Sequence, residues 1–264
     1  IDLLINRNGF TRNNRSSLFL NRIAPVQINF LGYPGTLGMK EIDYIIADKN
    51  IIPKDHFKYY HERVIHMPET YQPFSPEKFE IRNNRTDYGL PENAFILGCV
   101  SRIEKILPNI FNIWMKVLNK HSDAHLALCI NNQKVINNIN KYCDENNYDF
   151  NRIIFLKSID HGNNLIRVSN FDTYPYNGHT GISDSLFQSC VPTISITGNS
   201  FASRVSCSLL RSLKLEKLIT YTENDYFNRI QYFCSNREEL KKIKKYLIDY
   251  KKNNLNRMSK FTSD

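Results

Sequence analysis

From residue 95 onward, short apolar segments alternate with helical patterns, and this alternation limits the chain to few folds. The apolar segments read FILGCV, LALCI, IIFL and VPTISI, and each has the length and composition of a strand. Strands that alternate with helices in this way build parallel sheets covered by helices. The sequence therefore predicts a doubly wound α/β fold for this part of the chain.

The best-marked helix follows the first of these strands. Pro108 suits the first turn of a helix, because proline has no backbone N–H to donate there. One apolar stripe then recurs with helical period at Ile110, Ile113, Trp114, Val117 and Leu118. Further helices are predicted over residues 200–213, 223–234 and 237–252.

The first part of the chain contains strand candidates of its own, which read IDLLI, VQINFLG, YIIAD and RVIHMP. IDLLI opens the chain with no turn or cap before it, so we expect this α/β unit to be partial. A segment with two prolines, many charges and no apolar period follows, YQPFSPEKFEIRNNRTDYG. We place a boundary there, between a partial N-terminal half at residues 1–85 and a C-terminal half at residues 86–264.

Charge and cysteine content narrow the possible partners. The net charge of +9 favours an anionic partner, although residues 240–252 carry much of it and have the pattern of a solvated helix face. No apolar stretch approaches the roughly 20 residues of a membrane helix. The six cysteines form no CxxC pair, and we interpret them as reduced core residues. We expect a cytoplasmic protein that binds neither nucleic acid nor membranes.

One candidate site is the segment Asn177-Gly178-His179-Thr180-Gly181, which opens a helical pattern. In a doubly wound sheet, ligands collect where strands end and helices begin, because the first helical amides point outward. The two glycines would let the backbone approach an anion, and the histidine and threonine would add hydrogen bonds. The alternative is an Asn-Gly turn followed by a threonine that caps an ordinary helix.

A second candidate directly follows the strand FILGCV and includes Arg102 and Lys105. A lysine at the end of a strand could neutralise the charge that develops on a departing phosphate, with the arginine close by. The alternative is a lysine that pairs with Glu104 or with solvent.

Two further residues are candidates for the same site. Asp184 follows Thr180 by four residues, one helical turn, so both side chains can face one ligand. Its carboxylate could accept hydrogen bonds from a ribose diol, or it could favour the helix dipole as an acid in the first turn. His161 follows the strand IIFL and is a third group at a strand end, although an isolated loop histidine is usually solvated.

Four segments resemble the catalytic region of the O-linked N-acetylglucosamine transferases. They read LGYPGTLGMKEIDYIIAD at residues 31–48, MPETYQPF at 67–74, FDTYPYNGHTGISDSL at 171–186 and GNSFASRVSCSLL at 198–210. Their order and spacing are similar to those of the family. The resemblance implies a GT-B fold of two Rossmann-like halves, the N-terminal one incomplete here. It also implies an inverting enzyme that moves N-acetylglucosamine from UDP-GlcNAc to protein or peptide hydroxyls and needs no metal or cofactor.

The same resemblance implies roles for individual residues. His179 and Thr180 would hold the diphosphate, Asp184 the ribose and Lys105 the leaving phosphate, while His161 would lie near the uracil. Gly32 and Pro34 of the GYPGT motif would line the sugar and acceptor side.

The sequence departs from the family pattern at three points. Gly181 stands where the family usually has a second threonine, and the spacing from His161 to Asp172 is one residue short. We expect the first part of the N-terminal half and the tetratricopeptide repeats of the family to be absent upstream of Ile1. Alternatives are another donor, such as GDP-fucose or UDP-glucose, and a nucleotide-sugar-binding fragment without catalysis. The histidine of NGHT favours UDP-GlcNAc.

Overall fold

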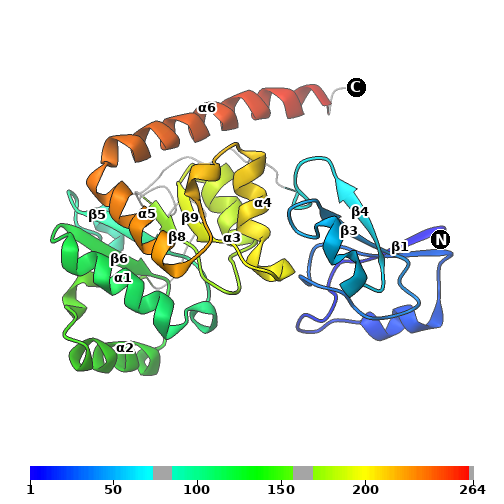
Figure 1. Ribbon diagram of the computed structural model, residues 1–264, viewed down its shortest axis with the longest axis horizontal. Coiled ribbons are helices and arrows are strands. Elements are labelled where there is room, and N and C mark those ends of the chain that lie inside the picture. The colour runs from blue at the N-terminus through cyan, green and yellow to red at the C-terminus, as the bar shows by residue number, and fades with distance from the viewer. Residues whose placement is uncertain (74–84, 157–168, 262–264) are drawn as a thin grey trace. The chain divides into compact units, whose positions relative to one another are not determined.

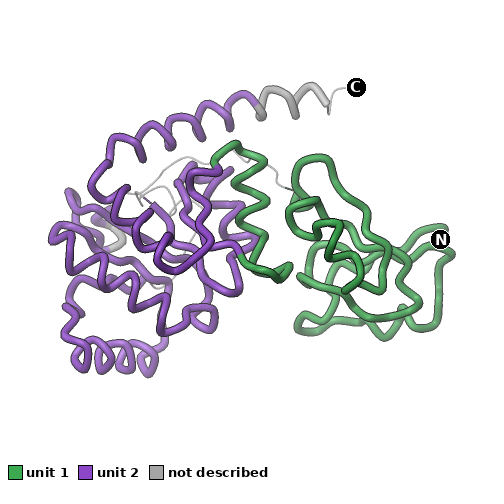
Figure 2. The backbone as a smooth tube through the Cα atoms, in the orientation of Figure 1, with its two compact units in different colours: residues 1–73, 198–215 green, residues 74–197, 216–264 purple. Residues whose placement is uncertain are grey.

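The computed structural model describes residues 1–73, 85–156 and 169–261, and it divides into two compact units (Figures 1 and 2). The first unit comprises residues 1–73 and 198–215, and the second comprises residues 74–197 and 216–264. Residues 198–215, which lie beyond the expected boundary near residue 85, are thus part of the first unit.

The second unit contains a parallel sheet in which the strand order is β10-β9-β8-β5-β6-β7. Its strands are β5 (Phe95–Cys99), β6 (Ala124–Leu128), β7 (Ile153–Phe155), β8 (Ser169–Phe171), β9 (Thr193–Ile196) and β10 (Ile219–Thr220). Counted from β5, this is the 3-2-1-4-5-6 order of a doubly wound nucleotide-binding sheet. The predicted parallel sheet is confirmed, and its strand order reverses between β5 and β8.

Helices alternate with the strands of this unit, as the sequence predicts. They are α1 (Pro108–Lys120), α2 (Gln133–Glu145), α3 (Thr180–Ser183), α5 (Glu223–Ser235) and α6 (Arg237–Phe261). The whole predicted stripe of α1 is buried. The indole of Trp114 donates to the Tyr226 hydroxyl of α5 (3.2 Å), and that hydroxyl donates to the Asp172 backbone oxygen (3.0 Å). α1 and α5 therefore lie side by side and are tied to the end of β8 (Figure 1).

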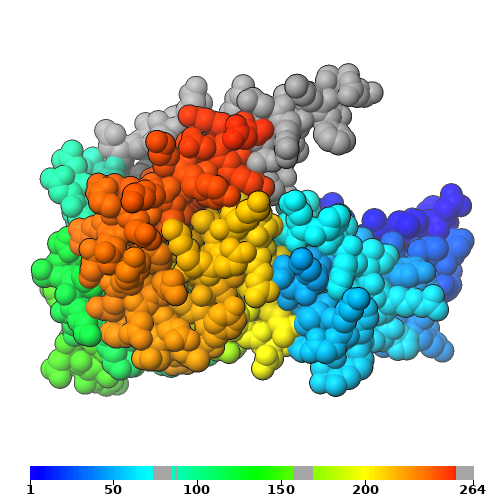
Figure 3. Space-filling model, turned by 45° about the horizontal axis from the view of Figure 1, so that its top comes forward, coloured from blue at the N-terminus to red at the C-terminus, as the bar shows by residue number. Residues whose placement is uncertain are grey.

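The basic run near the end of the chain is one face of α6, as the sequence predicts. Leu240, Ile243 and Leu247 are buried, whereas Lys241 and Lys245 point to solvent. The space-filling view shows α5 and α6 (orange to red) at the surface of the second unit (Figure 3). No helix in the described part of the chain has the length and hydrophobicity to cross a membrane. All six cysteines are free, and five of them are buried.

The first unit contains a parallel sheet of order β1-β2-β3-β4. Its strands are β1 (Leu3–Asn6), β2 (Val26–Asn29), β3 (Tyr44–Asp48) and β4 (Arg63–Met67). Three of them lie within the predicted segments, and β1 ends one residue beyond IDLLI. Helix α4 (Val205–Ser212) belongs to this unit. The buried carboxylate of Asp48 explains why, because it accepts from the Ser208 hydroxyl of α4 (2.6 Å) and from the Tyr71 backbone N–H (2.8 Å).

Candidate functional site

The loops that follow β5 and β8 meet where the strand order of the second unit reverses. The first loop contains a 3-10 turn (Ile103–Lys105), and the second leads into α3. Lys105 Nζ in the first loop donates to the Asn177 backbone oxygen in the second, at 2.8 Å. Such a switch point is where open α/β sheets bind their ligands, because neighbouring loops diverge there. The two sequence-predicted segments are therefore brought together at one place.

Lys105 is only half exposed, and its surroundings are mixed in polarity. Its ammonium lies 4.0 Å from the centroid of the Tyr176 ring. Burial lowers the pKa of Lys105 below its ordinary value; the nearby charge of Arg102 lowers this pKa as well, whereas Asp172 and Cys99 raise it. Arg102 itself is exposed. The hydrogen bond of Lys105 goes to the Asn177 carbonyl rather than to Glu104, and the partly exposed side chain also reaches solvent.

A buried carboxylate, which the sequence reasoning missed, shapes the loop after β8. Asp172 is 1% exposed and accepts from the backbone N–H groups of Thr173 (2.9 Å) and Gly178 (2.7 Å). It also accepts from the Ser195 hydroxyl of β9, at 2.6 Å. The only signal in the sequence is an acidic residue directly after a strand. These bonds hold residues 172–178 against the sheet and so place the start of α3.

Helix α3 begins at Thr180, at the position that the sequence predicts. His179 occupies the N-cap position and makes no side-chain capping bond, so the capping alternative for Thr180 is wrong. The His179 ring stacks on Tyr176, with centroids 5.1 Å apart and planes at 19°. The Thr180 side chain is exposed. The Ile182 and Ser183 amides donate to the His179 backbone oxygen (3.1 and 3.0 Å). The first amides of a helix, which precede these, have no acceptor within it and are left to bind ligands or water.

The two glycines of the segment differ in the space around them. A Cβ at Gly178 would lie 2.8 Å from Cγ1 of Ile182 and 3.2 Å from Oγ of Ser101. A Cβ at Gly181 would meet only Val100 Cγ2, at 3.6 Å. Close packing thus demands glycine at position 178, whereas position 181 has room for a side chain.

Asn177 and Asp184 flank these residues. Asn177 is buried, and its side-chain amide donates to the backbone oxygens of Thr173 (2.9 Å) and Ile196 (3.3 Å). The side chain therefore has a structural role, and the backbone oxygen is the group that contacts Lys105. Asp184 is half-buried and begins a π-helical segment (Asp184–Gln188) that continues α3. Short π-helical segments within helices occur frequently at functional sites.

His161 falls outside the described residues. Gly32 and Pro34 belong to the first unit, in the loop that follows β2. A Cβ at Gly32 would lie 2.0 Å from the Arg7 backbone oxygen, so the loops after β1 and β2 approach closely there. The buried carboxylate of Glu62 accepts from the Thr36 hydroxyl (2.5 Å) and thereby holds the GYPGT loop.

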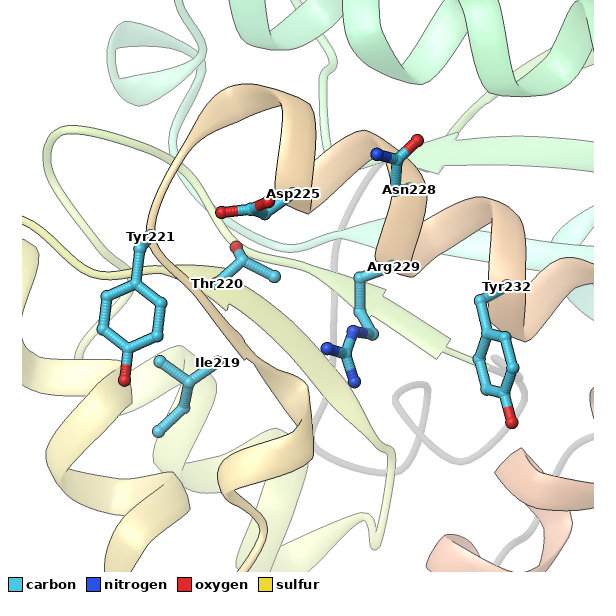
Figure 4. A pocket seen from close by; sticks show the side chains of 7 residues that line it. All are labelled: Ile219, Thr220, Tyr221, Asp225, Asn228, Arg229 and Tyr232. Carbon is cyan, nitrogen blue, oxygen red and sulfur yellow. The ribbon is translucent and has the colours of Figure 1, made fainter.

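One pocket of about 560 Å³ lies apart from the switch point, between β10 and α5 (Figure 4). Its lining residues are Ile219, Thr220, Tyr221, Asp225, Asn228, Arg229 and Tyr232. None of the predicted site residues lines it, and Arg229 already donates to the Lys217 backbone oxygen (2.7 Å). Within the described ranges, no group of three or more His, Cys, Asp or Glu side chains could hold a metal ion.

Comparison with known proteins places this geometry among the glycosyltransferases. The sequence profile of glycosyl transferase family 41 matches residues 1–79 and 75–264. The probable UDP-N-acetylglucosamine-peptide N-acetylglucosaminyltransferase SEC of Arabidopsis thaliana is 29% identical over 94% of this chain and 26% of its own length. The probable UDP-N-acetylglucosamine-peptide N-acetylglucosaminyltransferase SPINDLY of Oryza sativa subsp. japonica is 30% identical over 86% of this chain and 25% of its own length. The chain thus spans about a quarter of these relatives.

Among solved structures, a variant of the Thermobaculum terrenum O-GlcNAc transferase superposes with a TM-score of 0.86 at 23% sequence identity. The match covers 96% of this chain and 49% of that one. The likeness shows a GT-B fold, as expected from the sequence.

Proposed function

This chain belongs to glycosyl transferase family 41, and from that premise we propose that it binds UDP-GlcNAc and transfers the sugar to serine or threonine hydroxyls of proteins. The observation that carries the proposal is the 2.8 Å bond from Lys105 Nζ to the Asn177 oxygen. It brings a cation against the segment that opens α3, at the switch point of a nucleotide-binding sheet. The names of the relatives, which specify a UDP-N-acetylglucosamine donor and a peptide acceptor, support the choice of substrates.

In the proposed complex, the diphosphate lies over the start of α3. His179 and Thr180 hydrogen-bond its oxygens, Gly178 allows close approach of the backbone, and Gly181 contributes its amide. Lys105 then reaches the phosphate that leaves, with Arg102 adding positive charge at the rim. Asp184, one turn along the helix, accepts from the ribose hydroxyls.

The chemistry assigned to these residues is electrostatic. The acceptor hydroxyl oxygen attacks the anomeric carbon as the bond from that carbon to the diphosphate oxygen breaks. The bonding electron pair leaves with UDP, and the hydroxyl proton is released to water. Negative charge grows on the leaving diphosphate during this step. A preorganised ammonium and helix amides stabilise that charge more strongly in the transition state than in the ground state. Gly32 and Pro34 of the first unit are assigned to the sugar and acceptor side.

We assign the protein to the cytoplasm, because that reducing compartment suits cysteines that form no disulfide.

Two alternative functions are compatible with the same fold. One keeps the fold and the reaction but takes another donor, such as GDP-fucose or UDP-glucose. The other is a protein that binds nucleotide sugars without transferring them. A UDP-sugar donor is favoured because His179 is the N-cap residue of α3, directly before Thr180. The UDP-GlcNAc branch of the family, which the sequence resembles, has a histidine at this position.

Calorimetric titration with UDP and with GDP tests the donor, and a radiolabelled transfer assay with UDP-GlcNAc, UDP-glucose and GDP-fucose on the full-length gene product tests the reaction. We expect binding of UDP in preference to GDP, and incorporation from UDP-GlcNAc into protein. Preferential binding of GDP would overturn the donor assignment. Binding of UDP without any transfer would favour the non-catalytic alternative.

A further inference from the structure

Two of the groups assigned to the diphosphate, the Lys105 ammonium and the His179 imidazole, contact one aromatic ring, that of Tyr176. The Lys105 ammonium lies 4.0 Å from the ring centroid. The His179 imidazole stacks on the same ring, with centroids 5.1 Å apart and an interplanar angle of 19°. Tyr176 itself is 39% exposed, so the ring lies at the surface of the site rather than in the core. An exposed tyrosine with these two neighbours is not explained by core packing.

The backbone that carries this ring is held firmly on both sides. The Tyr176 carbonyl accepts from the Thr173 hydroxyl (2.7 Å), and the next carbonyl, that of Asn177, accepts from Lys105. The amide of Gly178 donates to the buried Asp172 carboxylate. Because the backbone of residues 176–178 is hydrogen-bonded to both loops in this way, the point from which the Tyr176 ring projects is fixed.

We propose that Tyr176 is a positioning residue for the donor diphosphate, whose ring face fixes the Lys105 ammonium and the His179 imidazole in the geometry that binds phosphate. The proposal rests on the proposed function, since it assumes that these two groups meet the diphosphate. A lysine side chain has four rotatable bonds and loses considerable entropy when it is ordered. The ring and the Asn177 carbonyl order it before the ligand arrives, so that less of this entropy is lost on binding.

The physical property that matters is the negative face of the ring, not the phenol hydroxyl. A cation is attracted to the face of an aromatic ring, most strongly to tryptophan and about equally to tyrosine and phenylalanine. Leucine has a similar hydrophobicity but no such face. The effect of substitutions should therefore follow the aromatic character of the side chain, in the order Trp, then Tyr and Phe, then Leu.

The first experiment is a double-mutant cycle read by calorimetric UDP titration. Tyr176→Phe should bind UDP within about twofold of the unsubstituted protein, and Tyr176→Leu should bind about 3- to 30-fold more weakly. In a Lys105→Met background, Tyr176→Leu should lose most of that effect, because the cation that the ring holds is gone. Equal binding of the Phe and Leu variants, or an equal loss in both backgrounds, would overturn the proposal.

The second experiment needs no nucleotide and separates this proposal from the proposed function. The pKa of Lys105 Nζ is measured by NMR after ¹³C reductive methylation of the lysines, in the unsubstituted protein and in Tyr176→Phe and Tyr176→Leu. Loss of the ring face should lower this pKa further in the Leu variant only, because the charged form loses a stabilising contact. Lys120, which lies 4.9 Å from the Phe227 ring, is the internal control and should not change.

The two readouts distinguish the possible failures. If the protein does not bind UDP but the Lys105 pKa depends on the ring as expected, the assigned ligand is wrong while the contact itself holds. If UDP binds and the Lys105 pKa is the same in all three proteins, Tyr176 does not position Lys105. Melting temperatures of the three proteins show whether Tyr176→Leu is still folded. If it is not, Tyr176→Phe is compared with the unsubstituted protein, and a loss of UDP affinity or a changed Lys105 pKa in Tyr176→Phe would overturn the proposal.

Discussion

The ammonium of Lys105 donates to the backbone oxygen of Asn177 at 2.8 Å, and this bond joins the loop after β5 to the loop after β8. The two loops leave neighbouring strands at the point where the strand order reverses. Lys105 is therefore ordered before any ligand binds, and one of its N–H groups is already used. Its remaining donors can face a phosphate, which is the basis of the first prediction.

Lys105→Met is expected to reduce transfer much more than it weakens UDP binding. The charge is aimed at the leaving phosphate, where it is most effective as negative charge develops, and loss of one such group typically costs about 10²- to 10³-fold in kcat. UDP affinity should fall by less than about tenfold. Steady-state kinetics and calorimetry on the full-length protein measure both quantities. Lys120→Met is the matched control, and near-normal turnover in Lys105→Met would make Lys105 an ordinary surface lysine.

His179→Ala should weaken UDP binding as well as the rate, by about tenfold in dissociation constant, because the imidazole is assigned to the ground-state diphosphate. Calorimetric titration of UDP measures the change. His121→Ala serves as the control, since His121 lies at the end of α1 within 3.2 Å of Gln231 and far in sequence from the loop. An unchanged UDP affinity in His179→Ala would remove His179 from the proposed site.

Alanine substitution of the two glycines should have unequal effects on stability. Gly178→Ala brings a Cβ to 2.8 Å from Ile182 Cγ1, and Ile182 is fully buried and cannot move aside easily. We expect a loss of about 1–3 kcal/mol in the free energy of unfolding and weaker UDP binding. Gly181→Ala meets only Val100 Cγ2 at 3.6 Å and should change stability by about 0.5 kcal/mol or less.

Urea denaturation of the two glycine variants provides the measurement. Equal stability of both would show that the loop after β8 relaxes to accept a side chain at position 178. In that case the close packing of Gly178 would not be a requirement of the fold.

Glu62→Gln should destabilise the GYPGT loop of the first unit. The Glu62 carboxylate accepts from the Thr36 hydroxyl (2.5 Å) and the Leu37 backbone N–H (2.7 Å), and an amide can supply only one acceptor oxygen for these two donors. A loss of about 1–3 kcal/mol in unfolding free energy is expected from the unsatisfied buried group. Thermal and urea denaturation measure it against Glu69→Gln, an exposed residue of the same unit. Equal stability of the two variants would argue against this role of Glu62.

Much of the fold could be predicted from local sequence pattern. The strands β1 to β5, β7 and β9 and the stripe of α1 were all indicated by apolar composition or period, which a short window of sequence contains. β6 begins at Ala124, slightly earlier than predicted. β8 and β10 were missed. β8 reads Ser-Asn-Phe, and its residues form a strand because β5 and β9 pair with them on either side, not because of their own preference.

The candidate site was predicted only in part, for a related reason. The segments around Lys105 and around residues 177–181 could be found separately, the first because it follows a predicted strand and the second because its two glycines open a helical pattern. Their contact, the brace from Asp172 and the ring of Tyr176 between Lys105 and His179 could not. Likewise, nothing near Ser208 in the sequence indicates that its hydroxyl meets Asp48 and places α4 in the first unit.

The physical reason is the range of the interactions concerned. Helix and strand preferences come from backbone sterics and from neighbours a few positions away, so the sequence by itself determined the elements and the class of the fold. Contacts such as that between Lys105 and Asn177 form only after the strands have paired and closed the chain between them. Which polar groups face one another was therefore decided by the tertiary structure, through strand order and the burial of carboxylates that must be hydrogen-bonded.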